Sequence, residues 1–100
     1  MTEEADERPL VVITGVTGYL GSVTFRKFIE DGSFRVRGTV RDVTNETKIG
    51  PLREAFGAAV FENLELVNAD LTDAESLEKA IAGATYVVHT ASPFHFKVFK

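Results

Sequence analysis

The 100-residue sequence contains no cysteine and no tryptophan, and only one methionine and three prolines. Without cysteine, neither a disulfide framework nor a thiolate metal site can form, which fits the cytoplasm. No apolar run exceeds a few residues, so we expect no membrane span, and the acidic first eight residues are unlike a leader peptide. The net charge of −4 argues against nucleic-acid binding, because neutralising phosphates requires a surplus of Lys and Arg. We therefore expect a cytoplasmic protein without nucleic-acid, membrane or metal partners.

The length suits one domain with a modest core. Hydrophobic residues make up 44% of the chain and charged residues 26%, as in ordinary globular proteins. Residues 1–8 are acidic and show no apolar periodicity, so we predict a disordered extension there. Residues 9–100 are predicted to form the domain.

Short β-rich runs alternate with longer helix-compatible runs, which is typical of βαβ units and a parallel sheet. The predicted strands are residues 9–14, 34–42, 64–71 and 85–90, and the predicted helices are residues 19–31, 51–59 and 73–82.

Three sequence signals set the predicted helix bounds. Gly32 is expected to end the first helix, and Pro51 suits the first turn of the second, where a missing N–H costs little. Thr72 and Glu75 form a T-x-x-E capping box for the third helix, which Gly83 would close.

The stretch VVITGVTGYLGS places Gly15, Gly18 and Gly21 between the first strand and the first helix. The first N–H groups of such a helix lack partners, and the positive end of the helix dipole favours an anion beside them. A pyrophosphate reaches those amides only where no Cβ intervenes, so glycine suits the turn, the closest approach and the helix–strand contact. Such a triplet alone is also compatible with a tight turn and close packing, but its place between strand and helix favours a dinucleotide.

The end of the second strand distinguishes between dinucleotides, because an acidic residue there accepts the ribose 2′-OH of NAD whereas Arg accommodates the 2′-phosphate of NADP. Arg41 occupies this place, and Lys48 can add a second charge. Asp42 follows Arg41 directly, so an inward-turned carboxylate would instead favour NAD.

Further candidates lie at the ends of the later strands. Asp70 can accept from an adenine amino group or simply lead into a helix cap. Thr90, Ala91 and Ser92 are small and allow a ribose or nicotinamide to approach the backbone. His89 stands within a strand pattern without a paired carboxylate or nucleophile, so we interpret it as structural.

Taken together, VVITGVTGYLGS, VRGTVRD followed by TNETK, NADLTD and VVHTASPF resemble the N-terminal part of an extended short-chain dehydrogenase/reductase. More narrowly, they resemble the dihydroflavonol reductase and cinnamoyl-CoA reductase group. The resemblance covers about residues 10–96. It implies half of a Rossmann-type doubly wound sheet, with strand order 3-2-1-4, helices on both faces and the fourth strand at an edge open to association.

The resemblance also implies an NADP(H) site. The phosphate loop would consist of Gly15, Thr17, Gly18, Tyr19, Leu20 and Gly21, and Arg41 and Lys48 would bind the 2′-phosphate. Asp70 and Leu71 would contact the adenine, and Thr90, Ala91 and Ser92 would line the site near the nicotinamide ribose. The sequence departs from the group at Val43, where proline is frequent, and at Gly50–Pro51, which interrupts a usually smoother helix.

Family members reduce a carbonyl substrate by hydride transfer from NADPH, using a Tyr-x-x-x-Lys pair that these 100 residues do not contain. We therefore expect the coenzyme-binding part of a longer reductase, inactive alone and without its substrate lobe. Two alternatives stay open: a non-catalytic NADP(H)-binding structural or sensing subunit, and a relative of the NAD-dependent sugar-nucleotide epimerases.

Overall fold

The computed structural model describes residues 7–70, 72–90 and 97–99. Its sheet has the strand order β3-β2-β1-β4-β5. The strands are β1 (Leu10–Thr14), β2 (Arg35–Val40), β3 (Glu65–Asn68), β4 (Tyr86–His89) and β5 (Lys97–Phe99). β1 pairs in parallel with β2 and β4, and β2 pairs in parallel with β3, so the predicted 3-2-1-4 order is confirmed.

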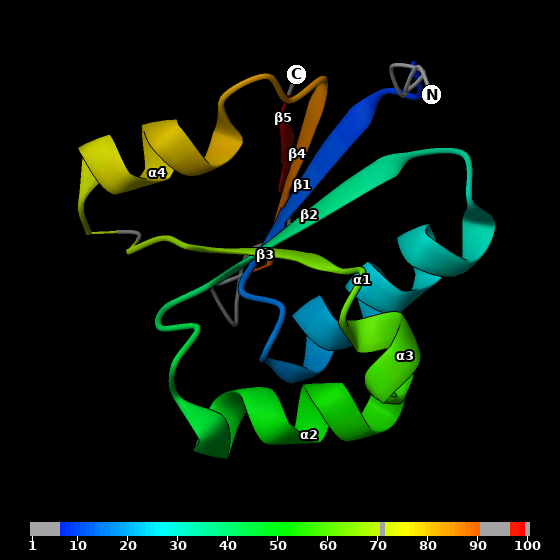
Figure 1. Cartoon of the computed structure of the whole chain (residues 1–100). Helices are drawn as coiled ribbons and strands as arrows, with labels where there is room; N and C mark the ends of the chain where they lie inside the picture. Colours follow the sequence, from blue (N-terminus) through cyan, green and yellow to red (C-terminus); the bar gives the residue numbers. More distant parts are fainter. Residues whose placement is uncertain (1–6, 71, 91–96, 100) are drawn as a thin grey trace, which may run out of the picture.

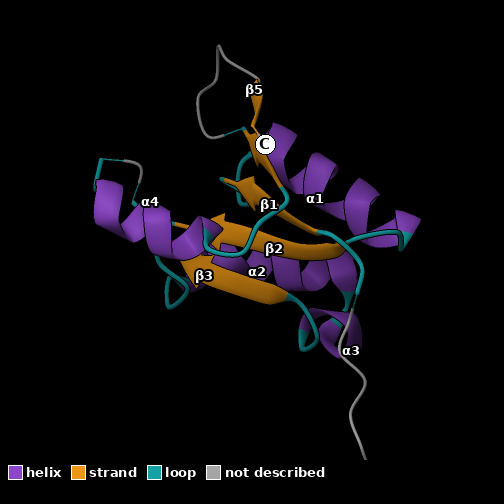
Figure 2. Ribbon diagram, turned by 90° about the horizontal axis from the view of Figure 1, so that it is seen from above, coloured by secondary structure: helices purple, strands orange, loops and turns teal. Residues whose placement is uncertain are grey.

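Helices cover both faces of this sheet (Figure 1). They are α1 (Tyr19–Asp31), α2 (Glu46–Phe56), α3 (Ala58–Phe61) and α4 (Ala74–Ile81). α1, α2 and α3 lie on one side and α4 on the other, as the view from above also shows (Figure 2). The change of side follows from right-handed crossovers, because the chain returns from β3 across the sheet to β4.

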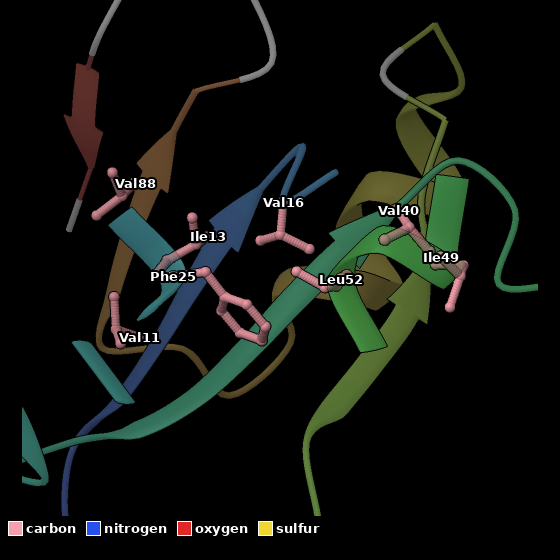
Figure 3. Packing of buried hydrophobic residues seen from close by; sticks show 8 residues of the cluster. All are labelled: Val11, Ile13, Val16, Phe25, Val40, Ile49, Leu52 and Val88. Carbon is pink, nitrogen blue, oxygen red and sulfur yellow. The ribbon is translucent and has the colours of Figure 1, made fainter. Parts of the chain in front are cut away.

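The core lies between the sheet and the α1–α2 layer. All five residues of β1 are buried, as expected for a central strand covered on both faces. Phe25 of α1 is fully buried and meets the ring of Phe56 edge to face, with ring centroids 5.8 Å apart. Figure 3 shows Ile49 and Leu52 of α2 entering the same cluster, so apolar contacts hold both helices against the strands.

The bounds of α1 agree with the prediction, and Gly32 caps the helix in the left-handed region with φ of 78°. The predicted start of the second helix at Pro51 is wrong. α2 begins five residues earlier, where the side chain of Asn45 accepts from the backbone N–H groups of Thr47 and Lys48. Pro51 is exposed inside the helix, where its missing N–H removes one hydrogen bond to the preceding turn.

The predicted capping box of the third helix is also wrong. Asp73 is the N-cap of α4, and its carboxylate accepts from the backbone N–H groups of Glu75 and Ser76. The hydroxyl of Thr72 instead donates to the carboxylate of Asp70 at 2.7 Å.

The expectation that the fourth strand forms the edge of the sheet is wrong as well. β5 pairs antiparallel with β4, joining Val88 to Val98 in register. An edge strand presents unpaired N–H and C=O groups, which the next extended segment satisfies here. In the part of the chain that the structure describes, no helix has the length and apolar character needed to cross a membrane.

Candidate functional site

The turn after β1 is bonded to the neighbouring strand β2. Gly15 has a φ of 68°, a region that favours glycine, and its N–H donates to the hydroxyl of Thr39 at 3.2 Å. The next residue, Val16, donates its N–H to the carbonyl of Thr39 at 3.1 Å. One buried residue of β2 therefore fixes the first bend of the glycine stretch.

Gly18 is the N-cap of α1 and leaves the first turn of that helix without a capping side chain. A Cβ built on Gly18 would meet only the carbonyl oxygen of Gly15, at an ordinary distance of 3.5 Å. With φ of −78°, the backbone there is open to any residue. Neither packing nor conformation within the chain requires glycine at this position.

Gly21 is required by packing. A Cβ on Gly21 would collide with the backbone carbonyl of Gly15 and would lie 2.8 Å from the hydroxyl of Thr90. The absence of a side chain therefore lets α1 rest directly on the turn and on the end of β4, as predicted for the third glycine.

A buried hydrogen-bond network joins the carboxyl ends of β1 and β4. The N–H of Thr90 donates to the hydroxyl oxygen of Thr14 at 3.0 Å, and the hydroxyl of Thr90 donates to the carbonyl of Thr14. The same hydroxyl of Thr14 lies 2.9 Å from Nδ1 of His89. The tautomer of His89 decides which of the two groups donates in this contact. In either direction the contact ties the imidazole to the end of β1, which agrees with the structural interpretation of that histidine.

A pocket of about 250 Å³ opens beside this turn, at the carboxyl ends of the strands. Its lining comes from three segments of the chain, which follow β1, end β2 and follow β3: Gly15, Thr17, Thr39, Val40, Arg41, Ala69, Asp70 and Thr72. The structure thus brings Gly15, Thr17, Arg41 and Asp70 together, as the sequence predicts. Sequence reasoning missed four lining residues, although their places at or just after strand ends were the available signal: Thr39, Val40, Ala69 and Thr72.

Asp42 does not line this pocket. Its carboxylate accepts from both the N–H and the hydroxyl of Thr44, at 2.9 and 2.6 Å. The hydrogen bond from that hydroxyl holds the pKa of Asp42 below its usual value. The competing prediction, in which Asp42 turns inward toward a ribose, therefore lacks support in this geometry.

Asp70 lines the pocket with its carboxylate held by the next turn. Its Oδ1 accepts from the hydroxyl and the N–H of Thr72, which lower the pKa of Asp70, and Arg41 lowers it further through charge. Asp70 therefore borders the pocket, as an adenine contact would. It also precedes the N-cap of α4 at Asp73, as a residue leading into a helix cap would.

Lys48 lies in the first turn of α2 and is exposed. It borders a second, smaller pocket of about 120 Å³, with Thr17 and Ser22. Thr17 lines both pockets, so it stands between the surroundings of Arg41 and those of Lys48. The pairing of Arg41 with Lys48 on one phosphate stays a prediction.

The remaining predicted residues fall into two groups. Tyr19 and Leu20 are exposed at the start of α1, by 88% and 45% of their surface. Leu71, Ala91 and Ser92 lie outside the described residues. No cluster of three or more His, Asp or Glu residues suited to a metal ion occurs within residues 7–70, 72–90 and 97–99.

Comparison with known proteins decides the family. The model of the NAD dependent epimerase/dehydratase family matches residues 11–98. The chain belongs to this family. Within the family, the chain is similar to dihydroflavonol reductases and cinnamoyl-CoA reductases and belongs to their group. This confirms the resemblance seen in the sequence.

Two relatives illustrate the similarity. A dihydroflavonol 4-reductase from Hordeum vulgare is 44% identical over 86 residues, which cover 86% of this chain and 23% of that enzyme. A cinnamoyl-CoA reductase 1 from Petunia hybrida is 45% identical over 84 residues, covering 84% of this chain and 24% of that enzyme. The chain therefore spans about a quarter of the length of the relatives it matches.

Solved structures support the fold. The terminal R domain from the myxalamid PKS-NRPS biosynthetic pathway superimposes with a TM-score of 0.61. Its sequence identity is 18%, and the match covers 82% of this chain and 24% of that one. This match shows that the chain shares its fold with about a quarter of that domain.

Proposed function

We propose that the chain binds NADP(H) in the pocket beside Gly15 and is the coenzyme-binding part of a reductase that converts a carbonyl to an alcohol. One observation carries the proposal: a single pocket is bordered by the Gly15–Thr17 turn, by Arg41 and by Asp70. A diphosphate, a 2′-phosphate and an adenine are the three parts of the coenzyme that these groups suit.

The diphosphate would lie against the first turn of α1. The fold itself does not require glycine at position 18. A side chain at this position would, however, block access to the uncapped N–H groups of that turn. An anion gains from those N–H groups and from the positive end of the helix dipole. The residues present therefore fit a bound diphosphate.

The choice of NADP(H) over NAD(H) rests on Arg41. Its guanidinium is an exposed cation at the pocket, suited to bidentate bonds with a phosphate. Asp42, the residue that would favour NAD, is committed to Thr44. Bound NADPH would supply a hydride, and the proposed carbonyl substrate follows from relatives named as reductases.

The test is a titration of the chain with NADPH and with NADH, followed by the intrinsic fluorescence of the reduced nicotinamide. Arg41→Ala should cost about 1.5 to 3 kcal/mol of NADPH affinity, because a charge-assisted bond to the 2′-phosphate is lost. NADH, which has no such phosphate, should bind the variant almost unchanged.

Arg35→Ala is the matched control, since it removes the same charge from the opposite end of β2. It should leave both affinities close to those of the unmodified chain. Equal affinity of the unmodified chain for NADPH and NADH would refute the role of Arg41, and binding of neither would refute the proposal as a whole.

A further inference from the structure

The loop from Arg41 to Asn45 carries the guanidinium of Arg41 between β2 and α2. All of its residues are exposed, including Val43, so burial of apolar surface does little to fix it. Three local hydrogen bonds shape it: the N–H and the hydroxyl of Thr44 donate to the carboxylate of Asp42, and the N–H of Asn45 donates to the carbonyl of Asp42 at 3.1 Å. These bonds hold the loop together without attaching it to the sheet.

One hydrogen bond makes that attachment. The backbone N–H of Val43 donates to Oδ1 of Asn68, the last residue of β3, at 2.7 Å. Among the residues that the structure describes, no other hydrogen bond joins residues 41–45 to a segment other than the start of α2. Because the partner is a backbone N–H, the side-chain oxygen of Asn68, and not its nitrogen, faces the loop.

Asn68 stands beside the end of β2 without bordering the pocket. It is paired in register with Val40, the residue that precedes Arg41. The pocket is lined instead by the two residues that follow it, Ala69 and Asp70. The side chain of Asn68 contacts the loop that carries Arg41 and does not line the pocket itself.

We propose that Asn68 is a positioning residue for coenzyme preference: its bond to Val43 holds the loop so that Arg41 faces the 2′-phosphate. The inference rests on the proposed function and adds a residue to it. Binding to a flexible cation costs conformational entropy, because the side chain must be immobilised. A cation that is already ordered avoids this cost and therefore adds more to the binding free energy. Without the bond, the binding of NADPH must also order Arg41, which lowers the affinity for NADPH. The affinity for NADH should not change, because NADH has no 2′-phosphate to contact Arg41.

The experiment compares Asn68→Ala, Arg41→Ala and the double variant by titration with NADPH and NADH. Asn68→Ala should weaken NADPH about five-fold, the usual worth of one net hydrogen bond, and change NADH less than two-fold. In the Arg41→Ala background, Asn68→Ala should have no further effect on the ratio of the two affinities. Asn63→Ala is the matched control, since it removes an exposed asparagine side chain, on the turn before β3, that donates to the carbonyl of Ala59.

A second measurement follows the amide hydrogen of Val43 by hydrogen exchange. It should exchange faster in Asn68→Ala and stay unchanged in Asn63→Ala. Equal weakening of NADPH and NADH, or full effect of Asn68→Ala without Arg41, would overturn the positioning role. If neither coenzyme binds the unmodified chain, the proposed function is refuted, and if Arg41→Ala weakens NADPH and NADH equally, the role of Arg41 in it is refuted. If Arg41→Ala weakens NADPH alone but Asn68→Ala leaves both affinities unchanged, only the positioning role is refuted.

Discussion

Substitution of Gly18 and of Gly21 by alanine should have opposite consequences. At Gly18 the added methyl meets only the carbonyl oxygen of Gly15, 3.5 Å away, and the backbone suits alanine. The stability should fall by less than about 1 kcal/mol, the difference between glycine and alanine at a helix N-cap. A diphosphate held against the same turn would meet the methyl, at a cost of about 1 to 3 kcal/mol, or about 5- to 140-fold in NADPH affinity.

At Gly21 the methyl collides with the backbone carbonyl of Gly15 and approaches the hydroxyl of Thr90. Neither group can move without disturbing the end of a strand, so Gly21→Ala should lower the free energy of unfolding by at least about 1 to 3 kcal/mol. Urea unfolding measures the stability of both variants, and NADPH fluorescence measures their binding. Unchanged NADPH affinity in Gly18→Ala would show that no diphosphate lies there, and unchanged stability in Gly21→Ala would contradict the packing argument.

Three further predictions concern the surroundings of the pocket. Thr72→Val should destabilise the protein at pH 6, where the lowered pKa of Asp70 contributes its full stabilisation, and the difference should shrink as the pH falls from the usual carboxyl pKa toward the lowered pKa of Asp70; urea unfolding at pH 6 and pH 3 checks this decrease. Arg37→Met should cost about 1.5 to 3 kcal/mol in the same unfolding assay, because the half-buried guanidinium bonds Glu65 at 2.8 Å and two carbonyls at the end of α4. We expect the tautomer of His89 with the hydrogen on Nε2, because Nδ1 would then accept from the buried hydroxyl of Thr14, whose oxygen accepts from Thr90; nitrogen chemical shifts indicating an Nδ1–H form would contradict this arrangement.

Local sequence signals predicted the elements that short-range physics determines. The helix from Tyr19 to Asp31 is bounded by Gly18 and Gly32, and β1 is a continuous apolar run, so their types and bounds could be predicted. The start of α2 could not, because Pro51 suits a first turn in isolation. Burial of Ile49 against the core and the Asn45 cap extend the helix through it instead.

Tertiary pairing explains the remaining differences. β5 forms only because β4 offers unpaired backbone groups, which no local pattern in the tail reveals. At the site, the glycine stretch predicted the turn, but the supporting hydroxyl of Thr39 comes from another strand and depends on register. The attachment of Val43 by Asn68 is likewise a contact across 25 positions of sequence.

The two ends of the proposed coenzyme site differ in how firmly they are built. The glycine turn is bonded to β2 through Thr39 and, next to it, to β4 through Thr14, so it can rearrange only if the sheet frays. The loop that carries Arg41 is attached to the neighbouring strand at a single point. During evolution, preference for one nicotinamide coenzyme over the other could therefore drift through changes in that loop, while the cradle for their common diphosphate stays constant.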